Sequence, residues 1–505
     1  MTTGFIDELS DYDKDPRFVG QTLFGQGSVS QGPLSVLLVG DAGSGGTLVP
    51  DVSITRCMSS AEAGILAQVG SELYLMAISA LQIPDVELYL ATATLSGATA
   101  ATATITIAGT WTTAGSWRYR IGGVEIFDGI SASDTLSTVA ANIAAYINLH
   151  PELGVSATSL LGVVTLTVIS SGVRGNDWIL VQDTGELPAG ATSTLAGGAS
   201  VTNGGVRFTG GAGTENITTL LAVEFPKRFD RVGFAQRDST NVGKWEVQID
   251  AKAAPNEGRL EHAIGAFNSV LLSTATSIAQ TTLNNPRFQI MWMKNGETPP
   301  PAMAAVFAAK RGSVEGSTPN IGYDDYKLPG VRGATDADAD IPDHATRVSA
   351  LDAGVTPITT IEGQGAVVRS ITTRSLTSGG DADDRTVDTS ESWVPDWIRD
   401  ALRVYWTTDF KVKNPYVRDN FAPEENPPRR TGIATPQLWA QNAQRLMLGW
   451  EQDLIVTLVA FNPVVAQFNA VAKRIVSRVP VIVTPLQHQI EVSVEQVPYN
   501  SAVTA

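Results

Sequence analysis

The stretch that decides the predicted fold is Lys327–Ile358, which reads KLPGVRGATDADADIPDHATRVSALDAGVTPI. Its first part is predicted to be a loop, because Pro329 and Gly330 form a turn pair. Calcium binding is an alternative, but the central glycine of a calcium loop is missing and Arg347 stands where a bidentate glutamate is required. A solvated acidic loop is therefore preferred. Its carboxylates, separated by small residues, are Asp336, Asp338, Asp340 and Asp343.

A short helix is predicted to follow this loop. Pro342 suits its first turn, and Val348 and Leu351 are expected to face inward. Gly354 is well placed directly after the helix end, and residues 359–368 then become extended and β-rich. The stretch separates modules of mixed type from one compact α+β unit that follows it.

Size and composition limit the possible classes of protein. With 505 residues, 43% hydrophobic and 17% charged, the chain is expected to form two to four soluble domains. The net charge of −16 argues against nucleic-acid binding by the chain as a whole. Cys57 is the single cysteine, so an internal disulfide and a cysteine metal cluster are excluded. The acidic N-terminus and the lack of a long apolar run predict neither a signal peptide nor membrane insertion.

The first half of the chain is predicted to contain an α/β module with an insertion. Leu34–Val39 is expected to be a buried strand, and the GDAGSGGT that follows is a tight turn, because the Lys-Ser or Lys-Thr of a phosphate loop is absent. Ser59–Gln68 is predicted to be a helix and Glu72–Ile78 a strand. After the insertion, the predicted strands are Phe229–Ala235 and Phe288–Met293, with a helix at Met303–Lys310.

The insertion is predicted from a change to a Thr-, Ala- and Gly-rich texture. One helix, capped by Ser133, is expected within it. Surface decoration is the preferred role, and binding of a host receptor or glycan is the alternative. The clearest predicted strands are Thr102–Thr110, Arg118–Phe127, Val163–Ser170 and Asp177–Asp183.

The last part of the chain is predicted to hold three helices and two strands. The first helix starts near Pro395, the second covers Leu438–Trp450, and the third runs from Asn462 to about Arg478. The predicted strands are Val479–Val483 and Gln487–Val497. In the second strand, apolar residues alternate with polar ones.

Chemistry typical of enzymes is missing from the sequence. The four histidines have no zinc-ligand spacing, and no G-x-S-x-G motif is present. A metal-dependent hydrolase would need ligands that the sequence does not offer. We therefore predict that the chain is not an enzyme and uses no cofactor.

Several motifs in the C-terminal half occur in a recognisable order. The KLPGVRG and LDAGVTPI segments are followed by VVRSITTRSL (Val367–Leu376), D-x-R-x-x-D (Asp383–Asp388), VPDWIRDALRVYW (Val394–Trp406) and NPPRRTGIATP (Asn426–Pro436). This order resembles the C-terminal core of contractile tail sheath proteins, nearest the Mu-like branch of contractile-tailed phages and related particles. The resemblance covers about residues 222–505 and, more faintly, 34–80.

The resemblance implies a structural role. Sheath subunits form stacked hexameric rings around an inner tube, and the polymer contracts to drive the tube through a cell envelope. The implied partners are further copies of the chain, the inner tail tube protein, and baseplate and tail terminator proteins, without nucleic acid. The implied location is a virion tail or contractile particle assembled in the host cytoplasm; phage, tailocin and other devices remain open. A particle-surface adhesin that binds a receptor through the insertion is the alternative function.

The predicted fold class is α+β multidomain: an α/β sheath core with an inserted β-rich domain and extended N- and C-terminal arms. The expected divisions are an N-terminal arm (1–25), a middle domain (26–85 and 214–328), the inserted domain (86–213), a C-terminal sheath core (329–484) and a donated strand (485–505).

The resemblance also points to two sets of functional residues. Sheath subunits donate terminal segments to their neighbours, and an unpaired strand needs a partner. The expected inner-tube contact is a basic cluster late in the third helix, comprising Lys473, Arg474 and Arg478; favourable charge at a helix C-terminus is the alternative. The residues expected to exchange strands between subunits are Arg17, Phe18, Val19, Phe24, Ile490, Val492 and Val494.

Overall fold

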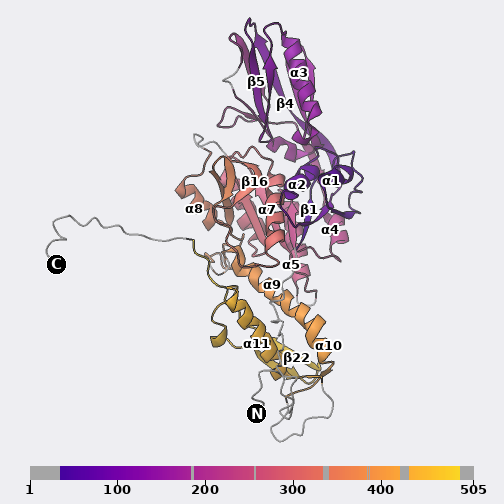
Figure 1. Ribbon diagram of the computed structural model, residues 1–505, viewed down its shortest axis with the longest axis vertical. Coiled ribbons are helices and arrows are strands. Elements are labelled where there is room, and N and C mark those ends of the chain that lie inside the picture. The colour runs from indigo at the N-terminus through magenta and orange to yellow at the C-terminus, as the bar shows by residue number, and fades with distance from the viewer. Residues whose placement is uncertain are drawn as a thin grey trace, which may run out of the picture. The chain divides into compact units, whose positions relative to one another are not determined.

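The computed structural model describes residues 34–183, 187–254, 257–333, 340–383, 385, 387–420 and 432–488. Contacts divide the chain into two compact units, which we call the large unit and the small unit. The large unit comprises Gly32–Ile398 with Val483–Ala505, and the small unit comprises Met1–Gln31 with Arg399–Ile482. The large unit contains the nine-stranded sheet, and the small unit contains the β21–β22 strand pair (Figure 1). The predicted α+β multidomain class is confirmed.

A nine-stranded sheet in the order β16-β18-β17-β15-β14-β13-β1-β3-β2 is the centre of the large unit. Its strands β3, β1, β13, β14, β15 and β17 run parallel, and their order around β1 is that of flavodoxin-like sheets. The bounds are β1 Ser35–Val39, β2 Ile54–Cys57, β3 Glu87–Ala91, β13 Arg231–Phe234, β14 His262–Phe267, β15 Phe288–Trp292, β16 Lys327–Arg332, β17 Val355–Ile361 and β18 Gln364–Val367.

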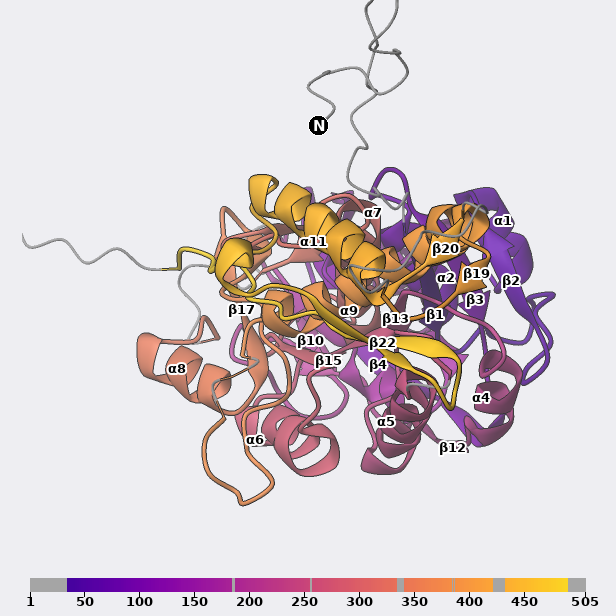
Figure 2. The same ribbon diagram turned by 90° about the horizontal axis from the view of Figure 1, so that it is seen from below.

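Helices cover both faces of this sheet. Val36 and Leu38 of β1 belong to the core on the α2 and α7 side, whereas Leu37 and Val39 belong to the core on the α4 and α5 side. This alternation is expected for a strand buried on both faces. Figure 2 shows α7 and α5 on opposite sides of the strands. The bounds are α1 Ser60–Leu66, α2 Glu72–Ala80, α4 Thr218–Glu224, α5 Ser239–Ala253, α6 Leu272–Thr276, η4 Ser277–Leu283, α7 Pro300–Val314 and α8 His344–Asp352.

Two further sheets between β3 and α4 form the inserted part of the large unit. One has the order β10-β4-β8-β7, with β12 also on β4, and the other has the order β11-β9-β5-β6. Helix α3 packs beside them, and their core contains Trp117, Tyr119 and Ile143 (Figure 1). The bounds are β4 Leu95–Gly109, β5 Gly115–Ile121, β6 Val124–Ile130, α3 Leu136–Leu149, β7 Val155–Leu160, β8 Val163–Ser171, η2 Val173–Asp177, β9 Ile179–Gln182, β10 Ala191–Ala196, β11 Val206–Arg207 and β12 Ala212–Glu215.

The small unit is built from helices and two short strand pairs. Its core includes Met447 and Trp450, and ring centroids of Phe410 and Trp439 lie 5.0 Å apart. Helix α9, Thr389–Tyr405, contains the division between the units. The remaining bounds are η5 Trp406–Phe410, α10 Lys411–Lys413, β19 Tyr416–Val417, β20 Ile433–Ala434, α11 Pro436–Gln452, β21 Val465–Asn469 and β22 Arg474–Arg478.

Two stretches of the α/β layer have a secondary structure other than the one predicted. Glu72–Ile78 is helical, because the Ser71 side chain accepts a hydrogen bond from the Tyr74 N–H and caps α2. The run ELYLMAI is apolar on several sides, so its period did not separate a strand from a buried helix. Lys327–Arg332 is strand β16, not loop, and pairs with β18 despite Pro329 and Gly330.

Helix termini also differ in detail from the predictions. Helix α8 lies where a helix was expected, with Asp343 as its N-cap and Gly354 at a φ of +70° after its end. Val348, however, is 40% exposed instead of facing inward. Helix α9 begins at Thr389, so Pro395 lies inside the helix and not at its start. Thr135, not Ser133, caps α3.

The expected domain limits differ from the observed architecture at one point. The limit between residues 328 and 329 falls within β16, and β16, β17 and β18 extend the nine-stranded sheet. The compact units instead divide at residues 398 and 482. The inserted sheets cover residues 95–215, close to the expected 86–213.

Candidate assembly surfaces

The edge of the sheet where α/β folds usually bind ligands is filled by the inserted part. That crevice lies beyond the carboxyl ends of β1 and β13, where the strand order reverses. Arg174 of η2 occupies it: its Nε and Nη2 donate to Glu72 at 2.8 and 2.7 Å, and its Nη1 donates to Glu215 at 2.5 Å. The cavity beside Arg174 and Trp178 measures about 10 Å³, which is at most the size of one water.

The glycine-rich turn after β1 faces the same crevice. The Gly43 N–H donates to Asp41 Oδ1 at 3.2 Å, and the Gly45 N–H donates to Gln68 Oε1 at 3.1 Å. Burial, and then the Glu72 carboxylate, raise the pKa of Asp41. Two of the backbone donors that could cradle a phosphate are thus already paired within the chain, in agreement with the predicted tight turn.

The inserted part is fixed to the sheet at a second place. Arg120 of β5 donates to both carboxylate oxygens of Glu297, with Nε 3.0 Å from Oε2 and Nη2 3.1 Å from Oε1. Asn203 donates to the same carboxylate at 2.9 Å. Both side chains of the Arg120–Glu297 pair are nearly buried. Two buried, charge-assisted contacts therefore hold the inserted part against the α/β layer.

In the acidic loop before α8, the structure describes one carboxylate ahead of the Asp343 cap, that of Asp340. This carboxylate is not solvated. Asp340 is 3% exposed and accepts hydrogen bonds from Asn295 at 2.8 Å and from Thr202 at 2.9 Å. Asp336 and Asp338 lie outside the described residues. The prediction of a solvated loop is wrong for Asp340, which joins a loop of the inserted part to the end of β15.

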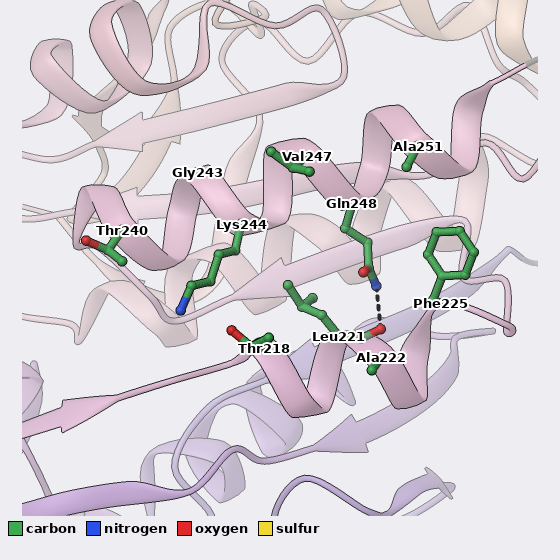
Figure 3. A pocket seen from close by; sticks show the side chains of 10 residues that line it. All are labelled: Thr218, Leu221, Ala222, Phe225, Thr240, Gly243, Lys244, Val247, Gln248 and Ala251. Atoms are coloured by element: carbon green, nitrogen blue, oxygen red, sulfur yellow. Dashed lines mark hydrogen bonds between the residues drawn. The ribbon is translucent and has the colours of Figure 1, made fainter.

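A groove between α4 and α5 lies on the surface of the large unit and has a volume of about 550 Å³. Figure 3 shows Lys244 toward one end and Phe225 toward the other, with Gln248 donating to the Leu221 carbonyl at 2.8 Å. Its lining is mostly apolar, and Lys244 is its one charged member. The groove lacks the converging titratable groups that a reaction site needs.

Close to this groove, a lysine is buried between two glutamates. The Lys252 Nζ donates to Glu224 and Glu261, and all three side chains are fully buried. Burial, and then the Glu224 carboxylate, raise the pKa of Glu261 to about 8. Both glutamates are tied to Lys252 or to the backbone, since Glu261 also accepts from the Phe229 N–H at 2.8 Å. We regard the cluster as structural.

The candidate assembly site of the small unit is the hairpin of β21 and β22. The strands pair antiparallel from Val465 with Arg478 to Asn469 with Arg474, and the turn passes through Lys473 at a φ of +48°. Within the described residues, neither strand pairs with any other. Each strand therefore has an outer row of backbone N–H and C=O groups without a strand partner, which is the usual template for adding another strand.

The two faces of the hairpin differ. Ala466, Phe468 and Ile475 are half-buried on the face that packs on α11, and Figure 2 shows the hairpin running beside that helix. The opposite face presents Val465 and Val476, which are 52% and 49% exposed. Cross-strand partners share a face, so Arg474 and Arg478 lie on this outer face as well.

The three predicted basic residues lie on one hairpin and not on a helix. Lys473 is in the hairpin turn, while Arg474 and Arg478 are exposed at the two ends of β22. None of them forms an ion pair with another described residue. The predicted helix Asn462–Arg478 is wrong because the chain reverses at residues 470–473, where the Ala472 N–H donates to Asn469 Oδ1 at 2.9 Å. The alternative of charge at a helix C-terminus is thereby removed.

The C-terminal part of the small unit, residues 399–482, has a charge opposite to that of the whole chain. Residues 399–482 contain eleven Lys and Arg against seven Asp and Glu, whereas the whole chain has a net charge of −16. The same residues hold twelve of the twenty-seven large exposed apolar side chains in the described part of the chain, including Phe461 and Val471. Exposed apolar groups beside basic ones are typical of a surface that binds a partner.

The segment after residue 482 belongs to the large unit, and its main contact there was not predicted. The Thr484 carbonyl accepts a hydrogen bond from Asn320 Nδ2 at 3.0 Å. His488 lies between two carboxylates, with Nδ1 2.5 Å from Asp324 Oδ2 and Nε2 3.1 Å from Asp388 Oδ2. The strand predicted from Gln487 onward included His488, yet Gln487 and His488 are not in a strand, and neither is Val479–Val483. No local signal links His488 to residues 164 and 100 positions away.

The residues predicted to exchange strands lie outside the described part of the chain. They are Arg17, Phe18, Val19 and Phe24 of the N-terminal arm, and Ile490, Val492 and Val494 of the donated strand.

Two features of the described residues bear on other classes of protein. No helix among them is both long and apolar enough to cross a membrane. No group of three or more His, Cys, Asp or Glu side chains among them is arranged to hold a metal ion.

The chain was compared with known families, curated proteins and solved structures. No family model matches, and no curated protein matches. Among solved structures, the chain is similar to a sheath tail protein from Desulfitobacterium hafniense, with 13% identity, a TM-score of 0.44, and coverage of 89% of this chain and 92% of that chain. A sheath tail protein from Listeria innocua gives 10% identity, a TM-score of 0.46, and coverage of 90% and 92%. The helical sheath of the anti-feeding prophage in its contracted state gives 11% identity, a TM-score of 0.41, and coverage of 96% and 99%.

Proposed function

We propose that this chain is a structural subunit of a contractile tail sheath. In this proposal, copies of the chain form stacked hexameric rings around an inner tube, and the rings contract to drive the tube through a cell envelope. The observation that carries the proposal is the β21–β22 hairpin, whose two outer edges have no strand partner among the described residues. The ordered motifs from Lys327 to Pro436 support the same assignment.

The hairpin is proposed to accept strands from neighbouring subunits. The proposed donors are the N-terminal arm, with Arg17, Phe18, Val19 and Phe24, and the C-terminal strand, with Ile490, Val492 and Val494. Strand addition gives a net stabilisation of roughly 1 kcal/mol per backbone hydrogen bond. Repeated in every subunit, such links connect the polymer while leaving the faces of the large unit free to repack during contraction.

The basic cluster is proposed to face the inner tube. Lys473, Arg474 and Arg478 are exposed and lack acidic partners among the described residues, so they are available for an acidic partner surface. Exposed charge pairs contribute little individually, about 0–1 kcal/mol each. Contacts of that strength suit an interface that has to release when the sheath moves.

A role without catalysis is part of the proposal. The crevice in which a flavodoxin-like sheet would bind a ligand is occupied by Arg174, and the α4–α5 groove has one charged lining residue. Baseplate and tail terminator proteins are proposed as the partners at the ends of the polymer. The proposed location is a virion tail or contractile particle assembled in the host cytoplasm.

Negative-stain electron microscopy of the purified full chain tests the proposal. At raised concentration we expect tubes or ring stacks with helical periodicity. Removal of residues 489–505 is expected to abolish the tubes, because these residues include the proposed donated strand with Ile490, Val492 and Val494. Monodisperse small particles, even with a tube protein present, would instead support a particle-surface adhesin acting through the inserted part.

A further inference from the structure

The groove between α4 and α5 is apolar at its rim as well as inside. Its lining includes Leu221 and Phe225 from the α4 side and Val247 and Ala251 from the α5 side (Figure 3). Val247 is 70% exposed, and Ala251 is exposed as well. With a volume of about 550 Å³, the groove has room for several side chains. Exposed apolar groups beside a hollow are typical of a docking surface.

A single cation stands at one end of this groove (Figure 3). The Lys244 Nζ donates to the amide oxygens of Asn216 at 2.8 Å and Asn241 at 3.5 Å. Both of these partners are neutral, so they leave the charge of the ammonium group uncompensated. A partner that fills the groove is therefore expected to bring an acidic group to this end.

An exposed apolar loop is present in the small unit of the same chain. It comprises residues 453–461, between α11 and β21, and we call it the leucine loop. Leu454, Leu458 and Phe461 are 68%, 49% and 83% exposed. Asp453, at the start of the loop, is exposed as well. An acidic group thus precedes three exposed apolar side chains, and this is the composition that the groove requires in a partner.

Side chains of α11 hold the backbone of the leucine loop. The Val459 N–H donates to Glu451 Oε1 at 3.0 Å, and Gln444 Nε2 donates to the Val459 carbonyl at 3.0 Å. Leu454 and Leu458 have φ values of +57° and +56°, a left-handed conformation that leucine rarely adopts. Because contacts with the helix fix the loop in this conformation, little backbone freedom is lost when it docks.

We propose that the leucine loop of one copy docks into the α4–α5 groove of a neighbouring copy, with Asp453 beside Lys244 and Phe461 toward the Phe225 end. A contact between two different surfaces of the same chain repeats from copy to copy and produces rings or helical filaments. The inference rests on the proposed sheath function and deepens it, since it adds a contact between copies that does not involve strand addition.

Cysteine crosslinking in the full chain tests the contact directly. Ala460 lies in the leucine loop and Ala251 in the groove, both are exposed, and the natural Cys57 is buried. A chain with Ala460→Cys, mixed with a chain with Ala251→Cys and a short bismaleimide, should give crosslinked dimers that neither chain gives alone. A chain with both changes should give a ladder of multiples. Ala472→Cys, a matched change in the hairpin turn, should not crosslink to Ala251→Cys.

Charge exchange provides a second test of the same contact. Lys244→Glu in the Ala251→Cys chain should lower the yield of dimer roughly threefold to tenfold, and Asp453→Lys in the Ala460→Cys chain should restore it. Lys227→Glu, a change of another exposed lysine of the large unit, should leave the yield unchanged. Crosslinks that stay within one chain, dimers from either variant alone, or failure of Asp453→Lys to restore the yield would overturn the inference.

Electron microscopy of the same samples separates the contact from the proposed function. Tubes without crosslinks between Ala251→Cys and Ala460→Cys would reject the contact and keep the sheath function. Crosslinked ladders without tubes would keep the contact and reject the sheath function. The absence of both tubes and crosslinks would reject both.

Discussion

The large and small units place similar residue types in opposite environments. The large unit buries charged side chains in pairs, such as Arg231 with Glu315 and Arg174 with Glu72. The small unit has an ion pair between Lys413 and Asp409 at its surface and exposes apolar side chains around a hairpin with unpaired edges. The large unit is thus internally complete, whereas the small unit has the features of a surface that is completed by other chains.

Breaking the buried charge network should have the largest effect on stability. Arg174→Met leaves Glu72 and Glu215 buried without their cation, and we expect a loss of about 3–5 kcal/mol in the free energy of unfolding of the large unit. Urea unfolding followed by tryptophan fluorescence measures this loss. The matched control is Arg56→Met, whose ion pair with Glu87 is 3.7 Å long and exposed, and which should cost less than about 1 kcal/mol.

Core truncation in the small unit should show that the two units are separately stabilised. Met447→Ala removes a buried side chain from α11, and we expect a loss of about 2–5 kcal/mol confined to that unit. Hydrogen exchange should speed up in residues 432–478 while the strands of the nine-stranded sheet keep their protection. Met447→Leu should cost less than about 1.5 kcal/mol. Equal loss of protection in β1 and β15 would mean that the units unfold as one.

The Lys252 cluster predicts a pH dependence that belongs to the large unit. Since burial raises the pKa of Glu261 to about 8, the folded chain keeps a proton that the unfolded chain releases near the usual value of about 4.3. The folded state binds more protons in that window, so stability falls as pH rises from about 5 to about 8. We expect a fall of at least about 1.4 kcal/mol, the equivalent of one pKa unit. Denaturant midpoints at both pH values measure it.

Glu261→Gln should flatten this pH dependence, because the amide does not titrate. Glu257→Gln, a change at the partly exposed neighbour, should leave it intact. A stability that rises with pH over this window in the parent chain would contradict the assignment.

The basic cluster should have the smallest effect on stability and a selective effect on assembly. Reversing Lys473 and Arg474 to Glu changes exposed side chains, so we expect the free energy of unfolding to change by less than about 0.5 kcal/mol. Sheath polymers should still form, while co-assembly with an inner tube protein should be lost. Cosedimentation of the two proteins measures this, and reversal of the exposed Lys227 provides the control. Unaltered cosedimentation would refute the tube contact.

Secondary structure was predicted best where a local feature of the sequence determines the element. The strand Phe288–Met293 was predicted because a buried run of apolar residues defines it. The helix predicted at Leu438–Trp450 is α11, Pro436–Gln452. The prediction for residues 462–478 was wrong because Val464, Phe468, Val471 and Ile475 also follow helical spacing. Packing on α11 and the turn before Arg474 favour a hairpin, and neither can be read from the local sequence.

The candidate sites show the same limit. The basic residues were found because three cations close together in an acidic chain are visible in the sequence. The position of His488 between Asp324 and Asp388 was not predicted, because these partners come from two distant segments that only the fold brings together. The filling of the sheet crevice by Arg174 was equally hidden, since η2 reaches β1 from the inserted part.

The position of Arg174 has a consequence for protein engineering. The residue belongs to the inserted part, but its two carboxylate partners, Glu72 of α2 and Glu215 of β12, lie before and after residues 92–211 in the sequence. A chimera that exchanges residues 92–211 for another module would leave both glutamates behind without their arginine. Successful grafting therefore requires a donor that carries an equivalent cation, or neutral residues at 72 and 215. The insertion can be exchanged only if the three charged residues Glu72, Arg174 and Glu215 are treated together.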